Sequence, residues 1–386
     1  MGSNRTAGAR CVTLAAAGDV STGHTPPASA FAYVTDALRA GDIRFAQVER
    51  LYTERGTYQE SSGALNFSVR QPPETAAAFT TVPFSVLSLA SNYTGSWGPE
   101  AIKDTVDTFR QLDIPTIGVG YNLAEARKPA IIEKHGLRIA FLGYCSVLLP
   151  QFWATDERAG CVPMRAHTFY EPYEFQPGSP AHIITTPHQG DFDLLLDDVR
   201  AAKAAADMVI VSLHWGLHFT PKVQEYQPII AHAAIDAGAS VILGHHSHQQ
   251  QAVEIYNDAV IYYGLGNLAF HPRKGGHALC MPNGGITHKE LYSEEPEPGH
   301  YYDYRRHWNE GGIAYVELDQ GGVKRAEYLP TLMNAAGQAE IVLPATAQFE
   351  TTHRYLEWVG KGVKGGVTSI PVRNGRFVYY ERNDQR

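Results

Sequence analysis

Side chains that commonly bind metal ions recur at separated places along the chain, each just after a short apolar run. They are Asp19, Glu49, Asn92, His214, His246 and His248. Carboxylate, amide oxygen and imidazole together form a hard-to-borderline ligand set, which suits Ca²⁺, Mg²⁺, Mn²⁺, Fe or Zn²⁺ better than a metal that prefers thiolates. We therefore predict a bound divalent metal ion, with Ca²⁺, Mn²⁺ or Zn²⁺ as the candidates.

The stretch from Gly244 to His248 carries the strongest local signal, because three of its residues are histidines. On an extended segment, side chains repeat every two residues. His246 and His248 are then expected to point toward the metal, and His245 away from it, into the surrounding shell or the core.

Each of the other candidates has a structural explanation when it is taken alone. Asp19 could cap a turn, Glu49 could be a surface charge, and His214 could be a hydrogen-bonded core histidine. The metal-site prediction therefore rests on the position that they share, at the ends of apolar segments.

Apolar strand-like runs alternate with helical segments along the chain, which predicts a layered α/β protein. Strands are expected at residues 11–17, 43–48, 82–90, 114–119, 137–145, 208–213, 240–243, 253–256 and 259–263, with a further pair around the turn at 320–322. Helices are expected from residue 98, at 192–206, at 227–237 and at 345–359. Ligand sites in such sheets gather at the carboxyl ends of the strands, so the metal-type residues should converge there.

Composition and charge narrow the function classes. The chain has 386 residues, of which 44% are hydrophobic, and a net charge of −8. No run of five Lys or Arg residues occurs, which argues against a nucleic-acid partner because phosphates require a basic surface. We find neither an apolar stretch long enough to span a membrane nor a signal peptide. The four dispersed cysteines fit reduced thiols, so we expect a cytoplasmic protein with no membrane partner.

Two long segments, 146–190 and 271–311, interrupt the alternation of strands and helices. Both are rich in proline and aromatic residues, and loops of this length in a compact domain are usually functional. We interpret them as walls of a substrate cleft, although their aromatic side chains could equally form small satellite cores that hold the loops down. The expected domain spans residues 11–330, with residues 331–386 as an extension that packs on it.

Several short motifs occur in an order that resembles one known family. They are Gly18-Asp19-Val20, Gln47-Val48-Glu49, the segment Ser88 to Thr94, His214-Trp215-Gly216, the segment Gly244 to His248 and the segment Tyr263 to Asn267. Together they resemble the CapA-like proteins, which are named for poly-γ-glutamate capsule biosynthesis and are similar to calcineurin-like metallophosphoesterases. The resemblance covers roughly residues 11–330. It implies a calcineurin-like four-layer α/β/β/α sandwich and metal-site roles for the six residues given above.

The sequence departs from the family pattern beside Asn92. The family has Asn-Asn-His there and an Asp three residues after the His, whereas this chain has Ser91-Asn92-Tyr93 and Ser96. In phosphoesterases of this fold, that His–Asp pair protonates the leaving alkoxide. The ordinary pKa of a tyrosine is near 10, so Tyr93 is a poor general acid near neutrality. A standard phosphoesterase is therefore not expected, and the ligand set is small for two metal ions.

A metal ion with imidazoles and carboxylates can instead support removal of a proton next to a carbonyl. That reaction needs a base, an electrophile for the developing enolate and an acid to return the proton. The candidates for the base and the acid are His214 and His248. Asp19 would orient one of them and Asp303 the other.

The chain also looks like one soluble branch of the CapA-like proteins, which accompanies lasso-peptide biosynthesis and epimerises the C-terminal residue of the precursor. This resemblance implies a metal-dependent peptide epimerase that inverts the Cα of a C-terminal, aromatic residue of a precursor peptide. Trp153, Tyr93, Trp215 and Tyr302 are the candidate substrate-binding residues.

Two other functions remain open from the sequence. The same metal could activate water in a metallohydrolase of amide, γ-glutamyl or phosphoester bonds. The chain could also be a non-catalytic protein that binds a peptide or a polymer.

Overall fold

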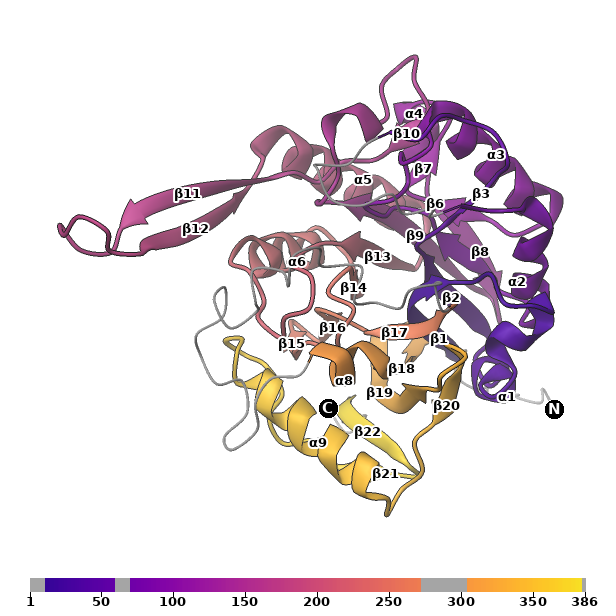
Figure 1. Cartoon of the computed structure of the whole chain (residues 1–386). Coiled ribbons are helices and arrows are strands. Elements are labelled where there is room, and N and C mark those ends of the chain that lie inside the picture. The colour runs from indigo at the N-terminus through magenta and orange to yellow at the C-terminus, as the bar shows by residue number, and fades with distance from the viewer. Residues whose placement is uncertain (1–10, 60–69, 272–303, 384–386) are drawn as a thin grey trace, which may run out of the picture.

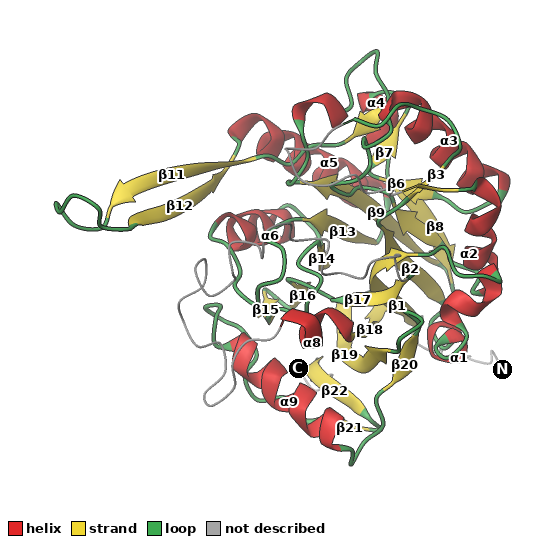
Figure 2. Ribbon diagram, viewed as in Figure 1, coloured by secondary structure: helices red, strands yellow, loops and turns green. Residues whose placement is uncertain are grey.

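Two β-sheets stack face to face at the centre of the molecule (Figures 1 and 2). The computed structural model describes residues 11–59, 70–271 and 304–383. The larger sheet has the strand order β21-β22-β19-β18-β1-β2-β5-β6, and β17 and β20 pair with β1 and β19. Its strands are β1 (Cys11–Ser21), β2 (Ile43–Val48), β5 (Val86–Ser88), β6 (Thr116–Ile117), β17 (Asn267–Phe270), β18 (Glu310–Asp319), β19 (Gly322–Met333), β20 (Ala339–Ile341), β21 (Val372–Arg373) and β22 (Arg376–Glu381).

The smaller sheet has the order β15-β16-β14-β13-β9-β8. Its strands are β8 (Ala130–Lys134), β9 (Leu137–Cys145), β13 (Met208–His214), β14 (Val241–His245), β15 (Val253–Tyr256) and β16 (Ala259–Tyr262). Short pairs outside the two sheets are β3 (Leu51–Tyr52) with β4 (Arg70–Gln71), β7 (Val119–Gly120) with β10 (Gly160–Cys161), and β11 (Ala166–Pro172) with β12 (Ala181–Pro187).

Helices surround the two sheets (Figure 1). They are η1 (Pro27–Phe31), α1 (Thr35–Arg39), η2 (Pro73–Ala77), α2 (Ala78–Thr81), α3 (Gly98–Gln111), α4 (Leu123–Ala126), η3 (Pro150–Phe152), α5 (Gln189–Ala205), α6 (Tyr226–Asp236), α8 (Tyr304–Asn309) and α9 (Ala347–Gly360). Side chains of η1, α2 and α3 pack on the larger sheet, and those of α5 and α6 pack on the smaller one.

The cores confirm the four-layer arrangement. Between the sheets, Phe45 of β2 stacks on Phe141 of β9 with ring centroids 6.2 Å apart. One outer core contains Phe79 and Phe109, and the other contains Leu195 of α5 and Ile230 of α6. The layers run helix, sheet, sheet, helix, so the predicted α/β/β/α sandwich is confirmed.

Most predicted strands appear where the sequence placed them, but β1 is longer than expected. It continues to Ser21, and its register shifts at Asp19, where β17 begins to pair with it in parallel. Asp19 therefore lies at an irregularity within β1 and not beyond its end. The extension depends on pairing with residues almost 250 positions later in the chain (Asp19 with Asn267), which the local sequence does not reveal.

The segment 146–190 does not have the structure expected from its aromatic content. Phe152 is buried, but β11 and β12 form a hairpin that projects from the body (Figure 1). Its aromatic residues Phe169, Tyr170 and Phe175 are exposed. Their assignment to a cleft wall or to a satellite core is therefore wrong. Most of the other long segment, residues 272–303, lies outside the described residues.

The C-terminal part of the chain belongs to the larger sheet and to the core between the two sheets. The expected boundary at residue 330 falls inside β19, and β22 pairs with β19 in the larger sheet. From α9, Phe349 and Tyr355 belong to the core between the sheets. Residues 331–383 thus complete the sandwich.

Candidate metal centre

Carboxylates and imidazoles from both sheets meet at one edge of the sandwich. Asp19 and Glu49 come from the larger sheet, at β1 and just after β2, and His214 ends β13 of the smaller sheet. His214 Nε2 lies 3.8 Å from Glu49 Oε1, and His214 Nδ1 lies 4.0 Å from Asp19 Oδ1. All three residues are almost completely buried. The expected convergence of residues far apart in the sequence is thus present in the structure.

His246 and His248 complete the cluster, but not in the way the sequence suggested. β14 ends at His245, and His246 and His248 have positive φ angles of 84° and 55°. The segment is a tight bend and not an extended strand, so the predicted alternation of side chains is wrong. Both imidazoles nevertheless reach the cluster. His246 Nδ1 lies 3.2 Å from His214 Nε2, and His248 Nε2 lies 3.5 Å from Glu49 Oε2.

His245 lies behind the cluster. Its ring packs on Phe45 at 5.8 Å between centroids, and its Nδ1 lies 3.7 Å from Asp19 Oδ1. It therefore occupies the surrounding shell, facing the core between the sheets.

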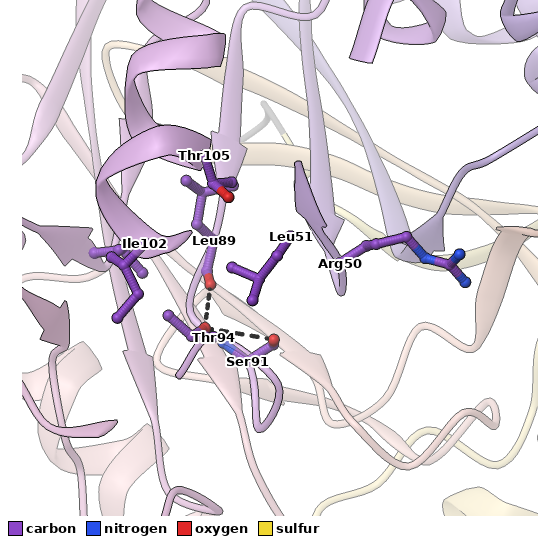
Figure 3. Close-up of a pocket in the computed structure, with 8 residues that line it drawn as sticks. Arg50, Leu51, Leu89, Ser91, Thr94, Ile102 and Thr105 are labelled. Carbon is purple, nitrogen blue, oxygen red and sulfur yellow. Dashed lines mark hydrogen bonds between the residues drawn. The ribbon is translucent and has the colours of Figure 1, made fainter. Parts of the chain in front are cut away.

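Asn92 is held in place by a turn that follows β5. Thr94 Oγ1 donates to the carbonyl of Leu89 and accepts from the backbone N–H of Ser91, at 2.7 and 3.0 Å (Figure 3). The cavity beside this turn has a volume of about 10 Å³, enough for one water molecule and too small for a substrate. The turn presents Asn92 Oδ1 at 3.1 Å from His214 Nε2.

Gln47 stabilises the same edge of the larger sheet through a side-chain hydrogen bond. Its side-chain amide donates to the carbonyl of Ala90 at 2.8 Å and so ties β2 to the end of β5. Gln47 thus supports the strand ends that carry Glu49 and Asn92.

Asn267 is a part of the site that the sequence analysis did not assign. Its Nδ2 donates to the carbonyl of Trp308 at 2.9 Å, so its Oδ1 faces His248 Nδ1, 2.8 Å away, as an acceptor. In the neutral imidazole, His248 Nδ1 must therefore carry the proton, which places the lone pair on Nε2, 3.5 Å from Glu49 Oε2. The motif Tyr263 to Asn267 contained this residue, but nothing local distinguished it from a strand residue.

His218 was also missed, because it lies in the loop after β13 and away from any strand end. Its ring centroid lies 3.8 Å from that of His246, and the ring is parallel to His248 at 5.5 Å. His218 is half-buried, whereas the other imidazoles of the cluster are buried. It therefore lies on the more open side of the centre.

Burial shifts the pKa values of the cluster toward the neutral forms. It raises the pKa of Asp19 to about 8, although the backbone N–H of His246 opposes this by donating to Asp19 Oδ2 at 3.1 Å. It lowers the pKa of His245 to about 3. Burial, followed by the neighbouring imidazoles, lowers the pKa values of His214 and His246 well below the usual range. Neutral imidazoles are the form that binds metal.

The donor set fits a divalent cation. Two overlapping groups each bring ligand atoms within 4.8 Å of one another, Glu49 with His214 and His246, and Glu49 with Asp19 and His248. Asp19 Oδ1 and His214 Nδ1 are buried and accept no hydrogen bond within the described residues. A cation would satisfy such buried acceptors. Glu49 belongs to both groups, so the cluster offers two adjacent places where a metal ion could bind. From the sequence, the ligand set was expected to be small for two metal ions.

The structure contradicts one of the predicted substrate-binding residues and leaves two as predictions. Trp215 is fully buried, stacks on Tyr263 at 6.0 Å and donates its indole N–H to the Tyr263 carbonyl. The assignment of Trp215 to substrate binding is wrong, because it follows His214 and points to the opposite face, into the outer core. Trp153 carries the guanidinium of Arg165 over its ring at 4.5 Å, and Tyr93 is half-buried beside Asn92. Both stay predictions.

Tyr302 and Asp303 lie outside the described residues.

Comparison with known proteins places this geometry in a family. Residues 13–272 match the family described as bacterial capsule synthesis protein PGA_cap. The capsule biosynthesis protein CapA of Bacillus anthracis is 28% identical over 62% of this chain and 53% of its own length. The PGA biosynthesis protein CapA of Bacillus subtilis is 29% identical over 63% and 57%. A probable polyglutamine synthesis accessory protein of Mycobacterium tuberculosis is 27% identical over 62% and 58%.

The chain thus spans only about half the length of the curated relatives that it matches (53–58%). Within the described part of the chain, no helix combines the length and the apolar character needed to cross a membrane.

Proposed function

This chain belongs to the bacterial capsule synthesis protein PGA_cap family, and from that premise we propose that it is a metal-dependent enzyme that inverts a Cα atom of a peptide. The proposal joins the buried carboxylate and imidazole cluster to the departures from the phosphoesterase pattern. The preferred substrate is a peptide with a C-terminal aromatic residue, as the resemblance to the epimerase branch implies.

The observation that carries the proposal is the placement of the imidazoles around the cluster. Beside Asn92, where a phosphoesterase needs an acid for the leaving group, the chain has Tyr93 and no histidine. On the more open side lies His218, in ring contact with His246. An imidazole there suits proton transfer at a substrate group held over the cluster.

In the proposed reaction, the residues would bind the metal ion, position a ligand or transfer a proton. Asp19, Glu49, Asn92, His214, His246 and His248 would hold the metal ion, which when bound would polarise a substrate carbonyl. Asn267 keeps the proton of His248 on Nδ1 and so fixes the direction of the Nε2 lone pair. His214 is fully buried, so we assign proton transfer on one face of the Cα to His218 in its place. For the other face, His248 stays the predicted acid–base group, with Asp303 as the residue that would orient it.

Hydrolysis of an amide or γ-glutamyl bond is the second candidate. It is favoured by the names of the relatives, which refer to capsule and PGA biosynthesis and to polyglutamine synthesis. The same cluster could activate water for such a reaction.

Incubation in D₂O separates the candidates. The protein is mixed with a peptide that ends in an aromatic residue, with and without a chelator, and the peptide is followed by mass spectrometry. Epimerisation incorporates a single deuterium at one Cα without cleavage, and the chelator abolishes it. Fragments would support the hydrolase, and an unchanged peptide would support a non-catalytic binding protein.

A matched pair of variants tests the assigned residue. His218→Asn should lower exchange by about 10²–10⁴-fold, the usual contribution of a general base. Tyr33→Phe, on an exposed side chain of the body, should leave exchange unchanged. Full exchange in His218→Asn would remove His218 from the proposal.

A further inference from the structure

The β11–β12 hairpin projects from the body of the molecule as a two-stranded sheet of its own (Figure 1). Among the described residues, β11 and β12 form strand pairs only with each other. β11 therefore presents one edge of backbone N–H and C=O groups that is open to another extended chain. On β12, the outer edge is partly occupied, because the backbone N–H of Thr185 donates to Glu225 Oε2 at 3.0 Å. An isolated two-stranded hairpin is only marginally stable in water, which makes a docked partner a natural source of further stability.

The hairpin exposes apolar side chains on both faces. Its register pairs Phe169 with Ile184 on one face and Tyr170 with Ile183 on the other. Tyr170 is 70% exposed, and at the tip Phe175 is fully exposed. Apolar side chains gathered on a projecting element mark an interaction surface more often than a solvated one.

The base of the hairpin is fixed to the edge that carries the metal centre. The backbone N–H of Met164 donates to the carbonyl of Cys145 at 2.9 Å, and Cys145 is the register partner of His214. Arg165 donates two hydrogen bonds of 2.6 Å to the buried carboxylate of Asp191. The hairpin thus starts from the strand end beside a metal-type ligand and is held firmly there.

The charge of the hairpin selects the kind of partner. Residues 166–187 contain Glu171 and Glu174 and no lysine or arginine. The loop at the tip surrounds an open hollow of about 560 Å³, which Tyr173 and Glu174 help to line. An aromatic ring beside a carboxylate attracts a cationic side chain through both its face and the negative charge.

We infer that the β11–β12 hairpin is a docking arm for an extended peptide that carries lysine or arginine beside apolar side chains. The peptide backbone pairs with an open strand edge, its apolar side chains pack on Tyr170 or Phe169, and a cationic side chain enters the hollow at the tip. This inference goes beyond the proposed function and does not depend on the metal.

A second copy of the chain is a poorer occupant of the same edge. Two-fold pairing of β11 with itself would gather Glu171 and Glu174 from both copies at one short interface. Like charges facing each other across strands are destabilising.

Fluorescence anisotropy with short labelled peptides tests the arm directly. The probe is a seven-residue peptide, the length of β11, in which lysine alternates with apolar residues. A matched peptide has glutamate in place of each lysine. The lysine peptide should bind at least about tenfold more tightly, more weakly at high salt, and equally well with a chelator present. Because no turnover is measured, a failure of the epimerase proposal leaves this result unaffected.

Matched variants locate the binding. Tyr173→Ser and Glu174→Gln should each weaken binding of the lysine peptide about tenfold, which corresponds to about 1.4 kcal/mol. Two control variants should bind the lysine peptide like the parent protein. They are Tyr33→Ser, at a side chain of the body that is 55% exposed, and Asp197→Asn on α5. Equal binding of the two peptides, equal loss in arm and control variants, or sedimentation showing that the arm joins two copies would each overturn the inference.

Discussion

His248 illustrates how a single hydrogen bond can set the chemistry of this site. Asn267 Oδ1 accepts the Nδ1 proton at 2.8 Å, because the amide group of Asn267 is already committed to the Trp308 carbonyl. The orientation and tautomer of a metal ligand usually depend on such a second partner. His248 Nε2 is therefore directed toward Glu49 before any ion binds.

We predict that Asn267→Ala weakens binding of a divalent ion by about 10- to 100-fold. The imidazole then loses the partner that fixes its tautomer, while all the metal-type side chains remain. Titration calorimetry with Mn²⁺ or Zn²⁺ measures the change. Asn334→Ala, on the loop after β19, is the control and should bind like the parent protein. Unchanged affinity in Asn267→Ala would show that His248 is held by other contacts.

The buried charges also predict how stability depends on pH when the metal is removed. The pKa of Asp19 is raised to about 8 in the folded state, so the folded state binds more protons than the unfolded state between the ordinary pKa and 8, and stability falls as pH rises there. The pKa values of His214 and His246 are lowered, and that of His245 falls to about 3. For these groups the unfolded state binds more protons below the ordinary histidine pKa of about 6.5, so stability rises with pH in that window.

Below about pH 6.5, the stabilising effect of rising pH through three histidines exceeds the destabilising effect through one aspartate. Above pH 6.5, only the effect of the aspartate is left. Chelated protein should therefore be most stable near pH 6.5 and lose stability toward pH 8, by no more than about 1.4 kcal/mol per pH unit. Asp19→Asn should remove the loss above pH 6.5. Excess divalent ion should reverse it, because metal binding requires deprotonated ligands. Urea unfolding at several pH values measures each case, and a persistent loss in Asp19→Asn would assign it to another group.

At the scale of secondary-structure elements, close contacts between backbone segments determine where the metal-type residues lie. Gly18 precedes Asp19, and a Cβ atom at this position would lie 1.9 Å from the carbonyl oxygen of Gly266. The same carbonyl accepts the backbone N–H of Asp19 at 2.9 Å. β1 and the segment before β17 can approach this closely only because residue 18 has no side chain.

We predict that Gly18→Ala destabilises the protein by about 1–3 kcal/mol and weakens metal binding as well, because β1 must move away from Gly266 and carry Asp19 with it. Gly190→Ala is the matched control, since its nearest neighbour is a movable side-chain atom of His188 at 3.3 Å. Denaturant unfolding and metal titration of both variants measure the two effects. Loss of stability without loss of metal affinity would separate the contact from the site.

The sequence predicted the elements whose signals are local. β2 and β9 lie where apolar runs were bounded by polar residues, and α3 begins at the expected Gly98-Pro99. It could not predict features that depend on distant partners. The pairing of Asp19 with Asn267 is one example, and the positive φ angles of His246 and His248 are another. The hairpin of β11 and β12 was missed because its strands contain exposed aromatic residues on both faces and show no alternation of apolar and polar side chains.

At the scale of the molecule, the site is an edge shared by two sheets, and both sheets need the C-terminal part of the chain. β22 pairs with β19, and Tyr355 of α9 donates to the carbonyl of Gln250, at the end of the histidine bend. Phe349 and Phe377 are buried in the core between the sheets. The sequence alone indicated an appended segment, because contacts that help to bury it, such as that of Tyr355 with Gln250, are with residues distant in the sequence.

Two deletions should therefore have opposite effects. Removal of residues 331–386 should abolish cooperative unfolding, because it cuts β19 and takes several large apolar side chains out of the core. Joining Ala166 directly to Pro187, which are paired at the base of the hairpin, removes the projecting residues and two hydrogen bonds between Thr185 and the start of α6, and should shift the melting temperature by a few degrees at most. Thermal unfolding followed by circular dichroism, with and without a divalent ion, measures both. If the C-terminal truncation still unfolds cooperatively and still gains stability from the ion, then residues 11–330 form the metal centre unaided, and the segment is an extension after all.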